Sequence, residues 1–168
     1  VSSAASDVYK RQSSDSPLSQ HVRANLAEVR RRIESRGVDP DRVRVVAITK
    51  TFDASAVRAA YEAGITRVGE NYLDELEVKR HACADLAHLE WQYVGAIQSR
   101  KIPRLLECAD LITTLARPKE IDLIAQRRDA ARVMIQVDTT TLAQRNGAAL
   151  SEVPSLVASA RQSGLVVE

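Results

Sequence analysis

The sequence predicts an α/β fold of the (β/α)8 barrel type, of which this chain holds only a part. Apolar segments rich in β-branched residues alternate with amphipathic segments at intervals of roughly 20–30 residues, the pattern of repeated βαβ units. The first apolar segment, 43–49, shows almost no alternation, so we expect a strand buried on both faces. No G-x-G-x-x-G follows it, which weakens the alternative of a doubly wound dinucleotide-binding sheet.

The predicted elements follow one another without a long interruption. A first helix has Ser16 as N-cap and Pro17 at its first position, and Gly37 ends it. Further strands are predicted at 66–68, 91–94, 111–114, 132–137 and 165–167, and helices at 54–63, 72–86, 99–108, 118–128 and 151–163. These elements make about five and a half βα units, whereas a full barrel needs about 250 residues. We therefore expect a chain truncated at its carboxyl end.

The first residues do not resemble a folded segment. Residues 1–15 are polar, small and unpatterned, so we expect a disordered tail. Within it, 7–12 (DVYKRQ) resembles the translation of a sequencing adapter, which would make everything up to about Gln12 an assembly artefact. A native flexible tail is the alternative. In either case the partial barrel is expected to comprise residues 16–168.

Composition excludes several classes of protein. The net charge of +2 gives no reason to expect binding to nucleic acid or to an anionic membrane, and no apolar run is long enough to span a bilayer. Cys83 and Cys108 form no CxxC, there is no secretory signal, and the three histidines lack metal-ligand spacing. We expect a cytoplasmic monomer or weak dimer without a metal.

The first candidate for chemistry is Lys50, which follows the first predicted strand. Barrels place their functional groups at the carboxyl ends of the strands. Only five of the 24 basic residues are lysines, so lysine is not the default cation here. Lysine can form an imine with an aldehyde cofactor, whereas arginine cannot. A surface lysine whose stem packs on the barrel rim is the alternative.

Three later loops are expected at the same end of the barrel. In the first, 69–72, Asn71 is placed to donate to a cofactor oxygen or to N-cap the next helix. In the second, 95–101, Gly95 permits close backbone approach and Ser99 can cap a helix. The third, 138–147, is a polar loop and a candidate lid, in which Arg145 binds an anion or is a solvated charge.

Four strings in this order closely resemble the pyridoxal 5′-phosphate homeostasis protein family, which has the fold of the alanine racemase N-terminal domain. The strings are Ala47-Ile48-Thr49-Lys50-Thr51, Gly69-Glu70-Asn71-Tyr72, Trp91-Gln92-Tyr93-Val94-Gly95-Ala96-Ile97-Gln98-Ser99-Arg100-Lys101 and Ile135-Gln136-Val137-Asp138. The resemblance covers about residues 18–168. It implies a single-domain (β/α)8 barrel with pyridoxal phosphate (PLP) bound as a Schiff base on Lys50.

We expect five cofactor-binding residues: Lys50, Asn71, Gly95, Gln98 and Arg145. The resemblance itself implies the imine on Lys50, places Asn71 beside the cofactor and implies a role. Proteins of this family bind, buffer and hand over PLP without established catalysis, so PLP-dependent apoenzymes are expected partners. The family's phosphate-binding loops follow its last strands and are missing here, so we expect this chain to bind PLP weakly or not at all.

The chain departs from the family pattern at four positions. The family commonly has His, Asn, Asn and Lys where this chain has Gln92, Arg100, Asp138 and Arg145. Gln92 hydrogen-bonds but does not titrate. Arg145 keeps the charge but forms no imine, which puts a transfer role for this loop in doubt.

Two rival functions remain open. A PLP-dependent amino-acid racemase needs acid/base groups on both faces of the substrate carbon. Lys50 supplies one, and no tyrosine or cysteine is an obvious second. The other rival is a barrel that binds a different phosphorylated ligand, with Lys50 as a plain rim charge.

Overall fold

The computed structural model describes residues 16–140 and 146–168, so the predicted tail 1–15 lies outside the described residues. Within these ranges, six strands form one sheet in the order β1-β2-β3-β4-β5-β6, and every neighbouring pair is parallel. The strands are β1 Ala47–Ile48, β2 Arg67–Glu70, β3 Glu90–Tyr93, β4 Leu111–Leu115, β5 Arg132–Ile135 and β6 Val166–Val167.

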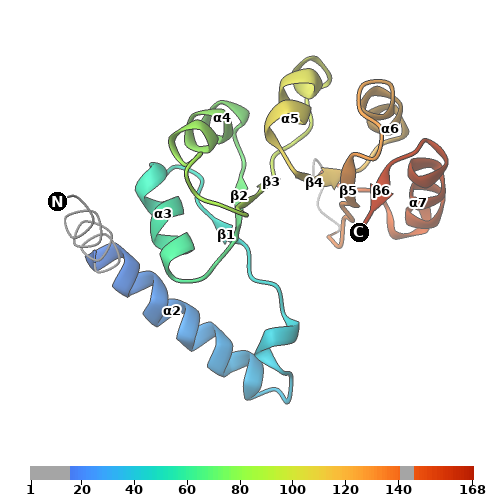
Figure 1. Ribbon diagram of the computed structural model, residues 1–168. Coiled ribbons are helices and arrows are strands. Elements are labelled where there is room, and N and C mark those ends of the chain that lie inside the picture. The colour runs from blue at the N-terminus through green and yellow to red at the C-terminus, as the bar shows by residue number, and fades with distance from the viewer. Residues whose placement is uncertain (1–15, 141–145) are drawn as a thin grey trace.

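Helices connect consecutive strands and lie around the outside of the sheet (Figure 1). They are α2 Pro17–Glu34, α3 Ala54–Glu62, α4 Leu73–Ala82, α5 Ile102–Cys108, α6 Pro118–Ala125 and α7 Val153–Gln162, with 3-10 turns η1 Pro40–Arg42, η2 Ser99–Lys101 and η3 Leu150–Glu152. Helices α3 to α7 form an arc, while α2 precedes β1 and packs beside α3 (Figure 1).

The strand order decides between the two predicted architectures. In a doubly wound sheet the order reverses at a switch point and helices cover both faces. Here each strand pairs with the one before it in the chain, and the order never reverses. Right-handed crossovers of this kind place all connecting helices on one side, which is the winding of a (β/α) barrel. The predicted fold, an incomplete barrel, is confirmed.

The predicted start of the first helix is confirmed, whereas its last residue is Glu34, three residues before the predicted Gly37. The Oγ atom of Ser16 accepts a hydrogen bond from the Ser19 backbone N–H at 3.1 Å, and Pro17 is the first helical residue. Gly37 has a φ of +73°, which a glycine adopts without steric cost, and the chain turns there after the helix.

The main core lies between the sheet and the outer helices. Its largest fully buried members include Val57 of α3, Leu76 of α4, Leu115 of β4, Ile121 of α6 and Val133 of β5. This layer removes apolar surface from water on one side of the sheet. The concave side holds a cavity of about 300 Å³, lined by both charged and apolar side chains such as Arg44, Glu90 and Met134.

The prediction that 43–49 forms a strand buried on both faces is wrong. Only Ala47 and Ile48 pair with β2, and relative exposure reaches 48% at Ile48 and 38% at Val43. The reason is the position of β1, which lies at the edge of the sheet with one neighbouring strand. Its outward side packs on the helices, whereas its concave side is not covered.

Other boundaries shift by a few residues. β2 extends to Glu70, so Gly69 and Glu70 belong to the strand and do not follow it as predicted. The helix predicted at 151–163 begins as η3 and continues as α7, and that predicted at 99–108 begins as η2 and continues as α5. Across the described parts of the chain, every helix is too short or too polar to cross a bilayer.

Candidate functional site

Three predicted site residues lie along one edge of the sheet. Lys50 comes two residues after the end of β1, Asn71 directly after β2, and Gly95 two residues after β3. Since these strands are parallel neighbours, their carboxyl ends meet at the same edge. Lys50 is exposed, Asn71 is half-buried and Gly95 is buried. The exposed Lys50 amine therefore lies at the same edge of the sheet as the less accessible Asn71 and Gly95.

Asn71 and Gly95 are in direct contact. A Cβ placed on Gly95 would lie 2.0 Å from the Asn71 carbonyl oxygen, closer than any side chain can approach. Gly95 is fixed from the other side, because Thr114 Oγ1 of β4 donates a hydrogen bond to its carbonyl at 2.6 Å. Next to it, Tyr93 Oη donates to the Ala96 carbonyl at 3.0 Å. These contacts join the loops after β2 and β3 into one surface.

The alternative role predicted for Asn71, capping the next helix, is wrong. Tyr72 occupies the N-cap position of α4, and no side chain caps that helix end. The expected capping by Ser99 is wrong as well, because Ser99 is the first residue of η2 and Gln98 takes the N-cap position. Neither Asn71 nor Ser99 therefore serves as the N-cap of the helix that follows it.

The remaining predicted site residues belong to the loops that follow β3 and β5. Gln98 is exposed in the loop after β3, and Arg100 is exposed two residues later. Arg145 lies outside the described residues, as do 141–144 of the candidate lid. Of that loop, Asp138 Oδ1 accepts a hydrogen bond from the Thr140 backbone N–H at 2.8 Å.

Sequence reasoning missed a buried ionic cluster directly behind Lys50. Lys79 of α4 is 4% exposed and Glu70 at the end of β2 is fully buried. Lys79 Nζ lies 2.8 Å from Glu70 Oε1 and 3.0 Å from Glu75 Oε2, and it donates to the Thr49 carbonyl at 2.8 Å. The available signal was the acidic end of an apolar strand together with Glu75 and Lys79 at i, i+4 spacing.

The backbone after Lys50 is in an unusual conformation. Thr51 has a φ of +69°, a left-handed conformation that is an outlier for a β-branched residue. Its backbone N–H donates to Glu75 Oε2 at 2.9 Å. Such a conformation persists only when neighbouring groups impose it, and such residues cluster at functional sites.

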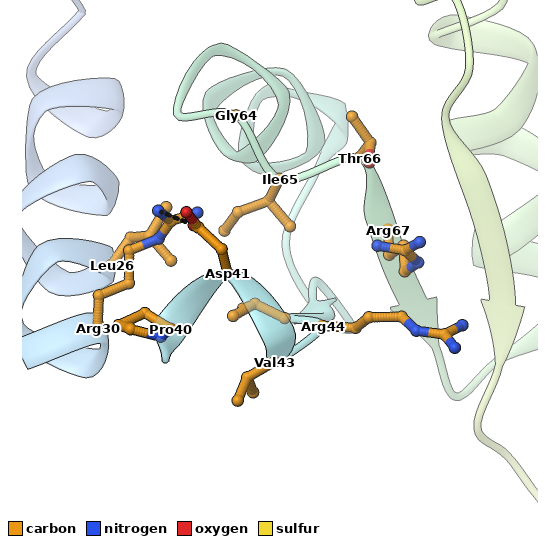
Figure 2. Close-up of a pocket in the computed structure, with 11 residues that line it drawn as sticks. Leu26, Arg30, Pro40, Asp41, Val43, Arg44, Gly64, Ile65, Thr66 and Arg67 are labelled. Carbon is orange, nitrogen blue, oxygen red and sulfur yellow. Dashed lines mark hydrogen bonds and ion pairs between the residues drawn. The ribbon is translucent and has the colours of Figure 1, made fainter. Parts of the chain in front are cut away.

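A separate cleft of about 350 Å³ lies at the opposite end of the sheet, near the amino ends of β1 and β2 (Figure 2). Its lining comes from α2, η1 and the segments that lead into the two strands, and Arg30 Nη1 lies 3.3 Å from Asp41 Oδ1 beside it. Of the predicted cofactor-binding residues that the structure describes, Lys50, Asn71, Gly95 and Gln98, none lines this cleft. Its position favours a structural role for it, since barrel chemistry gathers at the carboxyl end.

A parallel sheet wound in chain order, with a lysine just past its first strand, defines an α/β-barrel protein with a candidate site at the carboxyl ends of its strands. The family model described as "Alanine racemase, N-terminal domain" matches residues 19–168, and the chain belongs to this family. The match covers almost the whole partial barrel expected from the sequence.

Named relatives narrow the comparison. The chain is 32% identical over 151 residues to the pyridoxal phosphate homeostasis protein of Pseudomonas aeruginosa, covering 88% of this chain and 65% of the relative. For the protein of the same name from Escherichia coli K12, the values are 30% identity, 80% and 62%. The chain thus spans a little under two thirds of the length of these relatives.

Solved structures agree on the fold. PipY of Synechococcus elongatus with PLP bound has a TM-score of 0.66 at 25% identity, covering 80% of this chain and 63% of that one. Alanine racemase from Bacillus anthracis has a TM-score of 0.68 at 21% identity, covering 89% of this chain and 38% of the racemase. The second likeness concerns the fold alone.

The residues at the carboxyl edge fit the aldehyde end of PLP. An aldehyde cofactor bound through an imine needs a reachable primary amine, which the exposed Lys50 offers. Gly95 lies at the same edge, where the lack of a side chain lets its backbone pack directly against the Asn71 carbonyl.

Proposed function

We propose that this protein binds pyridoxal phosphate through Lys50 and acts in its homeostasis, as a carrier that buffers and delivers the cofactor to PLP-dependent apoenzymes. The observation that carries the proposal is the accessible Lys50 at the carboxyl edge, next to the Asn71–Gly95 contact. The names of the relatives and the PLP-bound PipY structure support the choice of cofactor.

The binding step is a condensation. Lys50 Nζ would hold the cofactor through a C=N bond to its aldehyde carbon, formed with loss of water from the aldehyde oxygen and the two amine hydrogens. Asn71 and Gln98 offer amide groups for the polar substituents of the ring. Gly95 allows the loops after β2 and β3 to pack together at this edge. Arg145 is proposed as a charge partner for the phosphate.

Borohydride trapping followed by peptide mass mapping tests this proposal. Reduction converts a C=N bond into a stable secondary amine, so even weak binding leaves a permanent mark on the lysine involved. With PLP in excess, we expect the adduct on Lys50 to form much faster than on Lys119, an exposed lysine of α6. Equal labelling of the two lysines would contradict the proposal.

Two variants sharpen the result. Lys50→Arg keeps the positive charge but cannot form an imine, so the imine absorption band and the Lys50 adduct should both disappear. Lys119→Arg makes the same chemical change on the outer helix layer and should leave the band intact. If Lys50→Arg retains the band, another lysine holds the cofactor.

Catalysis is tested separately. A carrier should convert L-alanine to D-alanine at no more than the rate of free PLP, because no second acid/base group is assigned at the site. Turnover well above that background, lost in Lys50→Arg, would replace the carrier by a racemase-like enzyme.

A further inference from the structure

The cluster of Glu70, Glu75 and Lys79 is built around the backbone on either side of Lys50. The ammonium group of Lys79 has three donors, and each finds an acceptor: Glu70 Oε1, Glu75 Oε2 and the Thr49 carbonyl oxygen. Two of these acceptors are carboxylates of α4 and β2, and the third is the residue directly before Lys50. One buried side chain thereby joins a helix, a strand and the loop that carries the candidate amine.

Both neighbours of Lys50 are fixed by this cluster. On one side, Thr49 is buried, its Oγ1 donates to Glu70 Oε1 at 2.5 Å, and its carbonyl accepts from Lys79. On the other side, the N–H of Thr51 donates to Glu75 Oε2. The peptide group before Lys50 is therefore tied to the Lys79 ammonium, and the one after it to the Glu75 carboxylate, which Lys79 also contacts.

The hydrogen bond from the Thr51 N–H to Glu75 Oε2, here called the Thr51 tether, is made by a residue in a backbone conformation that threonine disfavours. A threonine at a φ of +69° is strained. Its N–H donates to Glu75 Oε2, and the Phe52 N–H donates to the Thr49 carbonyl at 3.2 Å across the same turn. If the tether is removed, the loop is expected to relax toward ordinary backbone angles. That relaxation turns the peptide plane next to Lys50 and moves the root of its side chain.

Stability alone does not account for such a cluster. Buried ion pairs recover little more than their cost of desolvation, and well-packed apolar residues often serve as well. This cluster also leaves Glu70 Oε2 buried and without a hydrogen-bond partner within the described ranges. A buried charged cluster that adds little stability is consistent with a role in holding the backbone on either side of Lys50 in a fixed conformation.

We infer that Glu75 and Lys79 are positioning residues for Lys50: they hold Thr51 in its left-handed conformation and thereby direct the Lys50 amine toward the aldehyde of PLP. This inference rests on the proposed function, because it concerns the same amine. It adds two residues of α4 whose hydrogen bonds, within the described ranges, go to Thr49, Thr51, Glu70 and each other and not to the Lys50 amine.

Substitutions of Glu75 test the inference with a matched control on the same helix. The side chain of Glu75 is 32% exposed and that of Glu77 is 33% exposed, and Glu77 pairs with Arg104, away from Lys50. Glu75→Ala removes the tether, whereas Glu75→Gln keeps an oxygen that accepts from both Thr51 and Lys79. Glu75→Asp keeps the charge and shortens the reach, so it provides a second variant if Glu75→Ala fails to fold.

Two readouts are measured on each variant. The first is the rate of borohydride-trapped PLP addition to Lys50, and the second is amide hydrogen exchange of Thr51 without PLP. We expect Glu75→Ala and Glu75→Asp to slow addition on the order of tenfold or more, since small misplacement of a reacting group costs up to about a hundredfold. The same variants should lose protection at Thr51, whereas Glu75→Gln and Glu77→Ala should stay close to the parent protein.

The outcomes separate this inference from the proposed function. If Glu75→Ala reacts as fast as Glu77→Ala, or if Glu75→Gln is as slow as Glu75→Ala, the positioning role is refuted. If the parent protein labels Lys50 no faster than Lys119, the proposed function fails instead, and the exchange of the Thr51 amide still decides whether Glu75 holds that loop.

Discussion

The Asn71 carbonyl oxygen lies where a side chain on Gly95 would begin, 2.0 Å from the position of a Cβ atom. Because the obstacle is backbone, Gly95→Ala requires the loop after β2 or the loop after β3 to move. We expect a loss of about 1–3 kcal/mol in the free energy of unfolding, the usual cost of overpacking. Lys50 labelling by PLP should fall in parallel. Urea denaturation followed by the fluorescence of the single, buried Trp91 measures the first effect.

Gly69→Ala is the control for Gly95→Ala. A Cβ on Gly69 would lie 2.6 Å from Ile48 Cδ1, the far end of a half-exposed side chain that has room to move. We expect this variant to change the unfolding free energy by less than Gly95→Ala does. If the two substitutions cost the same, the contact of Gly95 with the Asn71 backbone is not the cause of the loss.

Removing one partner of the buried cluster should be far more damaging than removing both. Lys79→Ala leaves the carboxylate of Glu70 buried without its cation, and such a loss costs about 3–5 kcal/mol. The pair Lys79→Met with Glu70→Leu removes both charges and should recover most of that loss. Its Lys50 addition rate should nevertheless stay low, because Thr49 has lost its two hydrogen bonds to the cluster, those with Glu70 and Lys79.

Denaturation and borohydride trapping on the same three proteins give both quantities. A paired variant that regains stability and also regains the Lys50 rate would show that the cluster serves folding alone. A single Lys79→Ala variant as stable as the parent would show that Glu70 finds another partner or becomes protonated.

The cluster should also respond to acid. The hydrogen bond from the Thr51 N–H, followed by the one from Lys79, holds the pKa of the Glu75 carboxyl below its usual 4.5. A depressed folded-state pKa means that this stabilisation is present above the unfolded value and is lost as the pH falls through the folded value. We therefore expect Thr51 amide protection to fade only below pH 4.5, and a carboxyl ¹³C titration of Glu75 should place the midpoint there.

Glu75→Gln supplies the comparison for that titration. Its side chain carries no titrating group, so the acid-dependent part of the unfolding free energy that Glu75 contributes should vanish. A Glu75 midpoint at or above 4.5 in the folded protein would contradict the hydrogen bond to Thr51.

The two cysteines offer a measure of global opening. Burial raises the pKa of the Cys108 thiol to about 11, and burial also raises that of Cys83. Since the thiolate is the reactive form, we expect iodoacetamide to modify neither residue in mildly alkaline buffer, and both in denaturant. Modification of either cysteine in the native protein at the rate of a small free thiol would show that the helix layer opens locally.

The sequence predicted the winding of the fold better than the details of its first strand. The alternation of strands and helices is a local pattern, so it gave the order of the elements. Burial of a strand on both faces depends on what lies beside it, and β1 has only β2 as a neighbour. The apolar run that contains Ile48 therefore looked like a central strand, although its concave side is exposed.

At the site, sequence reasoning found the loops but not what holds them. In α4, Val78 is 69% exposed while Lys79 is buried, the reverse of what hydrophobicity predicts. The reversal is explained by Glu70, which lies on a different element and supplies the acceptor for Lys79. A pattern read along one helix carries no information about such a partner. The assignments of Gln98 and Arg145 to the cofactor stay predictions.

The strictly sequential strand order has a consequence for how the protein emerges from the ribosome. Every strand pairs first with the one made just before it, so each unit has a template ready when it is synthesised. Lys50, Glu75, Lys79, Asn71 and Gly95 all belong to the first three units. The amine and the residues proposed to orient it are thus expected to reach their final arrangement while the later strands are still being translated.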